Sequence, residues 1–127
     1  MPLVKIEIAK GKDSGYKKTF LQAVHEALVT ALKIPENDRI QRLYEVDIDC
    51  FEHEGKTENF SLIELTLFPG RSKEMKQCAV SEITRLLGER LNIQPFDIFI
   101  IINEPPLENW GLRGVLASDM GLSYKKN

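Results

Sequence analysis

The chain has 127 residues, of which 43% are hydrophobic and 28% charged, and its formal net charge at pH 7 is -2. These values are typical of one globular domain, and the slightly acidic balance argues against nucleic acid or an anionic membrane as the main partner. The sequence does not open with a basic region followed by a long apolar run. We therefore expect a cytoplasmic protein without a signal peptide or a membrane-spanning segment.

The first part of the chain predicts a strand, a helix and a second strand. The apolar run from Leu3 to Lys12 ends in a glycine and a cation, as a strand entering a turn does. Apolar residues then recur at three- and four-residue steps, which predicts an amphipathic helix containing Phe20, Val24, Ala27, Leu28, Ala31 and Leu32. The proline turn Ile34 to Asp38 ends this helix, and a strand is expected from about Ile40 to Asp47.

The same order of elements returns after a polar, acidic segment, residues 46–60, which we interpret as a linking excursion. Leu62 to Arg71 again ends in a glycine and a cation, and Ser72 is the expected N-cap of a helix. The apolar stripe of that helix comprises Met75, Ala79, Ile83, Leu86, Leu87 and Leu91. A strand is expected over Ile98 to Asn103, and residues 105–127 are expected to form a C-terminal hairpin or arm.

The two halves, about residues 2–45 and 61–104, align without a gap at a constant offset of 59 residues. This offset pairs, for example, Leu28 with Leu87 and Asp38 with Asp97. Two βαβ units with right-handed crossovers predict a single α+β domain: a tandem βαβ repeat whose four-stranded mixed sheet carries both helices on one face. The other face keeps apolar side chains, as in Ile98 to Ile102, and oligomerisation is the simplest way to cover them.

Four short motifs carry a family resemblance: Pro2, the loop Pro35 to Arg39, the turn Gly70-Arg71-Ser72 and the segment Asn109-Trp110-Gly111. With these motifs the sequence resembles the tautomerase superfamily, in particular its malonate semialdehyde decarboxylase-like branch, over essentially the whole chain. The resemblance implies a cofactor-independent enzyme, a small carboxylate substrate and a homotrimer whose sheets pack around a central axis. It also implies removal of Met1, which would leave Pro2 as the first residue.

The resemblance further implies catalytic roles for Pro2, Arg71 and Asp38. A terminal proline is a secondary amine, and burial or a neighbouring cation lowers its pKa, so that the neutral amine can act as a general base next to a carbonyl. Arg71 would grip the substrate carboxylate. Asp38 either assists proton transfer or only stabilises its turn, because Asp97 occupies the same place in the other half.

Three further residues are candidates for substrate binding: Trp110, Arg39 and Arg113. Trp110 would be a pocket wall or, alternatively, a core or subunit-interface anchor. Arg39 would bind a second carboxylate or, alternatively, be an exposed arginine, and Arg113 is the spare candidate for the carboxylate clamp. No zinc signature, phosphate loop or serine-nucleophile motif appears in the sequence, so neither a metal nor a cofactor is expected.

Three functions stay open at this point. The first is an isomerase in which Pro2 is the base on a 2-oxo acid or its enol. The second is a decarboxylase or hydratase in which protonated Pro2 is an acid, and the third is a catalytically silent ligand-binding trimer. Pro69 stands where the decarboxylases of the resembled branch have a second arginine, and this difference favours the isomerase over malonate semialdehyde decarboxylation.

Overall fold

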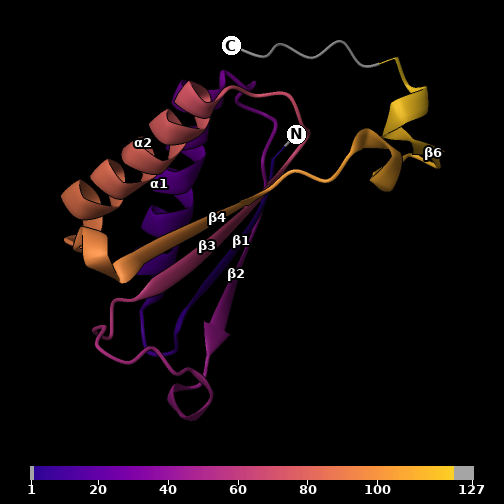
Figure 1. The fold of residues 1–127 in the computed structure, drawn as a ribbon. Helices are drawn as coiled ribbons and strands as arrows, with labels where there is room; N and C mark the ends of the chain where they lie inside the picture. Colours follow the sequence, from indigo (N-terminus) through magenta and orange to yellow (C-terminus); the bar gives the residue numbers. More distant parts are fainter. Residues whose placement is uncertain (1, 122–127) are drawn as a thin grey trace.

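The structure is a computed structural model that describes residues 2–121. A four-stranded sheet contains β1 (Pro2–Ala9), β2 (Ile40–Val46), β3 (Ser61–Leu67) and β4 (Ile98–Asn103) in the order β2-β1-β3-β4. Two helices, α1 (Ser14–Leu32) and α2 (Lys73–Leu91), cover one face of this sheet (Figure 1). Short 3-10 helices lie at Ile48–Cys50, Pro95–Asp97, Leu107–Asn109 and Ala117–Asp119.

The sheet is mixed, as the sequence predicted. β1 is parallel to β2 and β3 is parallel to β4, while β1 and β3 are antiparallel neighbours at the centre. Consequently the beginnings of β1 and β2 meet the ends of β3 and β4 at one end of the sheet, the upper end in Figure 1. The linking segment between β2 and β3 lies at the opposite, lower end.

The repeat extends to the backbone of the turns. Both helices have 19 residues, and each ends in a left-handed residue, Lys33 and Asn92, with the same φ of 56°. The turns that enter the helices contain Gly11 and Gly70, with φ values of 126° and 119°. Since such φ values favour glycine, both halves have a glycine at the same position of the turn.

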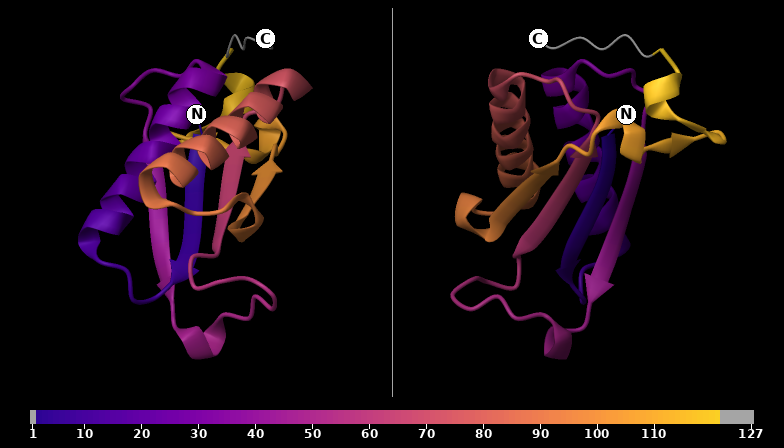
Figure 2. Two further views of the ribbon diagram at one scale, coloured as in Figure 1. Left: turned by 90° about the vertical axis from the view of Figure 1, so that its left-hand side faces the viewer. Right: turned by 45° about the vertical axis from the view of Figure 1, so that its right-hand side comes forward.

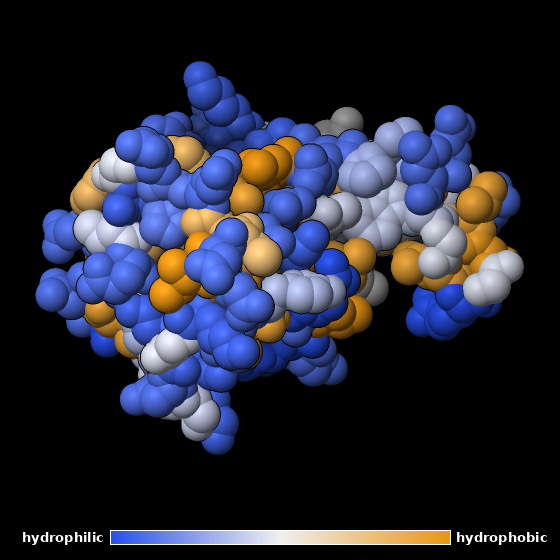
Figure 3. Space-filling view, turned by 90° about the horizontal axis from the view of Figure 1, so that it is seen from below, coloured by the Kyte–Doolittle hydropathy of each residue, from blue (hydrophilic) through white to orange (hydrophobic). Residues whose placement is uncertain are grey.

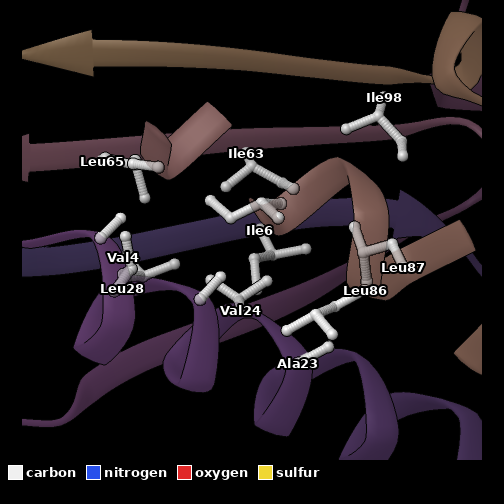
Figure 4. Close-up of a cluster of buried hydrophobic side chains, with 14 of the residues drawn as sticks. Val4, Ile6, Ala23, Val24, Leu28, Ile63, Leu65, Leu86, Leu87 and Ile98 are labelled. Carbon is white, nitrogen blue, oxygen red and sulfur yellow. The ribbon is translucent and has the colours of Figure 1, made fainter. Parts of the chain in front are cut away.

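Alternation along the central strands builds the core. In β1 and β3 every second side chain is buried against the helices, and the helices meet them with their apolar stripes (Figure 4). Burying one such aliphatic side chain stabilises a fold by about 1.5 to 3 kcal/mol. The core in Figure 4 includes Val4, Ile6, Val24, Leu28, Ile63, Leu65 and Leu87.

The face of the sheet opposite the helices is largely open (Figure 2). Tyr44, Phe99 and Ile101 remain 47%, 49% and 46% exposed in the single chain. Neither helix within residues 2–121 is long and apolar enough to cross a membrane.

The expected C-terminal arm is a small hairpin of β5 (Gly111–Leu112) and β6 (Val115–Leu116). Its two-residue turn, Arg113-Gly114, has positive φ at both positions, which is the geometry of a type I′ turn. Residues 122–127 of the expected arm lie outside the described residues.

Candidate active site

Four segments meet at the upper end of the sheet. Pro2 opens β1, and its partner Leu67 in β3 is followed by the turn that leads to Arg71. Asp38 lies just before β2, which runs parallel to β1, and Glu104 follows the last residue of β4. The topology therefore gathers three sequence-predicted catalytic residues, distant in the chain, at one end of the molecule.

Arg71 is the buried cation of this end. Only 8% of the residue is exposed, and burial lowers the pKa of its guanidinium, while the nearby carboxylates of Asp38 and Glu104 raise it. Glu104 also accepts a hydrogen bond from the Lys76 Nζ at 2.6 Å. The guanidinium is thus held at a partly desolvated position where an anion would be bound strongly.

Pro2 is buried on the helix-covered side of β1, in line with Val4 and Ile6. Met1, which precedes it, lies outside the described residues. A buried position disfavours the charged form of any amine placed there.

Trp110 lies in a small hydrophobic cluster beside the turn that leads to Arg71. Its ring packs edge-on against Phe68, with centroids 4.6 Å apart, and Leu3 packs against the same cluster. The indole Nε1 donates to the carbonyl oxygen of Pro105 at 3.0 Å, and the residue is 6% exposed. In the single chain Trp110 therefore anchors the arm to the sheet, next to the chain neighbours of Pro2 and Arg71.

The other two substrate-binding candidates are exposed and stand apart from this cluster. Arg39 directs Nη1 to the Gln22 Oε1 of α1 at 2.8 Å. Arg113 is at the hairpin tip, which points away from the body (Figure 1). Viewed from below, the arm projects beyond the rest of the molecule and carries apolar surface of its own (Figure 3), to which Val115 and Leu116 contribute.

Sequence reasoning did not place Lys76 or Glu104 in the site. The signal that could have found them is the repeat, since the offset of 59 residues maps them onto Lys17 and Glu45. That second pair is also formed, with 3.2 Å between Nζ and Oε1. Each half thus has the same lysine–glutamate contact, but only the pair at the upper end neighbours a buried arginine.

Family models, known proteins and solved structures are similar to this chain. A family model described as "Tautomerase enzyme" matches residues 38–113, and a second model of the same description matches residues 2–57. The probable tautomerase YrdN of Bacillus subtilis (strain 168) is 29% identical over 120 residues, which cover 87% of this chain and 89% of the relative. The 2-hydroxymuconate tautomerase of Comamonas testosteroni is 33% identical over 58 residues, 46% of this chain and 92% of the relative.

Solved structures share the whole fold. Malonate semialdehyde decarboxylase, described with decarboxylase and hydratase activities, is 26% identical with a TM-score of 0.79, over 91% of this chain and 94% of that one. A fused 4-OT asymmetric trimer has a TM-score of 0.86 at 19% identity, over 94% of this chain and 99% of that one.

Proposed function

This chain belongs to the tautomerase enzyme family, and from that premise we propose that it is a cofactor-independent isomerase of a 2-oxo acid or its enol. Pro2 is the general base and Arg71 holds the substrate carboxylate. The observation that carries the proposal is the pairing of Pro2 with Leu67, because it brings the start of the chain to the turn of a buried arginine.

The reaction moves a single proton. Once Met1 is removed, burial and the positive charge of Arg71 both disfavour the ammonium form of Pro2. The neutral amine takes the proton of the enol oxygen or of the carbon beside the carbonyl, and returns it to the other atom. Nothing is oxidised or reduced, so the step needs no cofactor.

Arg71 supplies orientation. A guanidinium donates two parallel hydrogen bonds to a carboxylate, and Arg71 directly precedes Ser72, the N-cap of α2, where helix N–H groups also attract negative charge. Asp38 and Glu104 stabilise the charged guanidinium from the protein side. Asp38 is in addition our candidate to assist proton transfer, and Trp110 supports the wall of the site through Phe68.

A second candidate activity is decarboxylation or hydration with protonated Pro2 as the acid. The likeness to malonate semialdehyde decarboxylase favours it, whereas Pro69, in place of a second arginine, weighs against it. Titration of the Pro2 nitrogen by NMR separates the two activities. A pKa near or below neutrality supports the base, and one well above neutrality supports the acid.

We further propose that the chain works as a homotrimer in which the open sheet face is buried. Phe99 and Ile101 project from β4 on that face and are each nearly half exposed, and the fused 4-OT structure of the same fold is a trimer. Ile101→Lys should release smaller species, detected by light scattering. Val80→Lys is the control, since Val80 is an exposed apolar residue of α2 on the opposite side of the sheet.

The proposed function is tested by the ultraviolet-monitored ketonisation of an aryl-enolpyruvate. We expect turnover by the wild type, a loss of about a hundredfold or more in Pro2→Ala, and a comparable loss in Arg71→Gln. Arg85→Gln removes an exposed arginine of α2 and is the matched control that should keep full activity.

Two outcomes would contradict the proposal. Retention of Met1 in the intact mass would leave no proline amine. No turnover by the wild type would turn attention to 3-oxo and acetylenic acids, and inactivity with those as well would support the silent ligand-binding trimer. Because 2-oxo-3-pentynoate and 3-bromopropiolate inactivate or inhibit proteins of this fold, covalent labelling of Pro2 by either compound is an independent check.

A further inference from the structure

A hollow lies at the lower end of the sheet, opposite Pro2. Its volume is about 370 Å³, a size suited to a small ligand. The polar side chains that line it are Lys10, Lys12, His53, Lys56, Thr57 and Glu58. We propose that this hollow is a binding site for a small carboxylate that the protein holds without converting it.

The repeat makes this hollow the counterpart of the candidate active site. The offset of 59 residues maps the turn Gly70-Arg71 onto the turn Gly11-Lys12. Both Gly11 and Lys12 line the hollow. Gly11 and Gly70 share the same left-handed backbone. A cation therefore follows the same turn at both ends of the sheet.

The charges of the lining favour an anion. Three lysines face one glutamate, Glu58. Lys10 is drawn to the exposed Asp47, at 3.7 Å, which leaves Lys12 and Lys56 as the main cations. Their attraction to an anion is strengthened by the concave, partly apolar walls that Ala9 and Ile48 contribute.

Lys12 and Lys56 are held in place by the protein. The Lys12 Nζ donates to the Asn59 Oδ1 at 2.6 Å and lies 4.9 Å from the centre of the Tyr16 ring. The Lys56 Nζ donates to the Phe96 carbonyl oxygen at 2.7 Å and lies 4.7 Å from the centre of the Phe99 ring. An ammonium has three N–H donors, and the hydrogen bond within the protein uses one of them in each lysine.

Thr57, which follows Lys56 and also lines the hollow, is fixed to the protein as well. Thr57 donates its backbone N–H and its hydroxyl to the two carboxylate oxygens of Asp97, which is 1% exposed. Asp97 is the repeat partner of Asp38. At this end the carboxylate is buried and both of its oxygens accept hydrogen bonds from Thr57, so Asp97 does not line the hollow.

The hollow lacks the group that would make it catalytic. Ser61 takes the place of Pro2 in the second half and, unlike a terminal residue, has a residue bonded to its nitrogen. It is fully buried and pairs with Ile8 in the sheet. Its nitrogen belongs to a peptide bond and has no basic lone pair to take a proton. The site therefore binds and does not turn over, whether or not Pro2 proves catalytic.

The test is a titration of the Arg71→Gln protein with malonate, followed by two-dimensional amide NMR at constant ionic strength. This background removes the anion partner of the upper end, so the result does not depend on the proposed activity. We expect saturable shifts of the amides of Gly11 and Thr57. Adding Lys12→Gln and Lys56→Gln should weaken the Kd at least tenfold.

The matched control adds Lys18→Gln and Lys33→Gln, which change the net charge equally at exposed positions outside the hollow. It should keep the original Kd, and well-dispersed spectra verify the fold of every variant. Shifts that stay linear, or that are absent at Gly11 and Thr57, would overturn the proposal. So would an equal loss of affinity in the control and in the Lys12/Lys56 variant.

Discussion

Replacing Asp97 by alanine should destabilise the fold far more than the same change at its repeat partner, Asp38. Asp97 is 1% exposed and accepts two hydrogen bonds from Thr57, at 3.0 Å from the backbone nitrogen and 2.5 Å from the hydroxyl. Hydrogen bonds to a charged group contribute about 1.5 to 3 kcal/mol each. Bonds that share one carboxylate are not additive, so we expect Asp97→Ala to cost about 3 to 4 kcal/mol.

Asp38 is surrounded differently. It is half-buried, and the turn bond from its backbone N–H to the Pro35 carbonyl, at 3.0 Å, would persist in an alanine variant. Its carboxylate acts on Arg71, so its removal should change the site more than the scaffold. We expect Asp38→Ala to cost about 1 kcal/mol or less in stability and to lower the ketonisation rate.

Urea unfolding followed by far-ultraviolet circular dichroism measures the first effect. All variants are compared at one chain concentration, because assembly would make the midpoint depend on concentration. In a domain of this size about 3 kcal/mol corresponds to roughly 10 °C in melting temperature, which gives a second readout. Asp97→Asn retains one acceptor oxygen and should lie between the wild type and Asp97→Ala.

Two results would refute this reasoning. Equal losses of stability in Asp38→Ala and Asp97→Ala would mean that both aspartates are turn residues of the repeat. A ketonisation rate that falls only in Asp97→Ala, with the fold intact, would place the reaction at the lower end of the sheet and not at Pro2.

Of two other predictions, one concerns the contact between α1 and α2 and the other concerns the arm. The Glu26 pKa is lowered to about 2 by hydrogen bonds from Arg90 and then Gln22; the stability that Glu26 contributes is therefore present above its ordinary pKa of 4.5 and is lost as the pH falls toward 2. Because this pair lies at the surface, the gap between the wild type and Glu26→Gln in urea unfolding should be small at pH 7 and should close by pH 2. Trp110→Ala should free the arm, so that limited proteolysis cuts within residues 105–121. Trp110→Phe keeps the packing on Phe68 and should remain resistant to the protease. It loses only the hydrogen bond to Pro105, which contributes about 1 kcal/mol. Equal protease sensitivity of the two variants would show that the indole N–H, and not the ring packing, holds the arm.

The elements could be predicted because their signals are local. The apolar stripes of α1 and α2 have helical spacing, and the gapless offset supports each helix with the other. The strand expected over Ile98 to Asn103 is β4 at the same bounds. The convergence of Pro2, Asp38 and Arg71 followed from the topology, since parallel and antiparallel neighbours decide which strand ends meet.

What could not be predicted depends on side-chain directions and on contacts between distant segments. Glu104 reaches the site only through the pairing of β4 with β3, and Lys76 only through the docking of α2. From the sequence, both Arg39 and Arg113 were candidates for binding a carboxylate. The structure turns the first toward α1 and places the second on a hairpin tip, because helix docking and the twist of a two-residue turn decide where such side chains lie.

A tandem repeat of this kind can carry only one amine base of the proposed type. A titratable backbone nitrogen exists only at a chain terminus, so the place of Pro2 in the second half must be filled by an amide, here that of Ser61. Once the lower end cannot perform the reaction, its residues no longer need to serve it, and Asp97 is free to become a buried structural acceptor. At the upper end the buried cation Arg71 lies near the carboxylates of Asp38 and Glu104. Substitutions at equivalent positions should therefore cost activity at the upper end and stability or accessory binding at the lower end, although the backbone at both ends is the same.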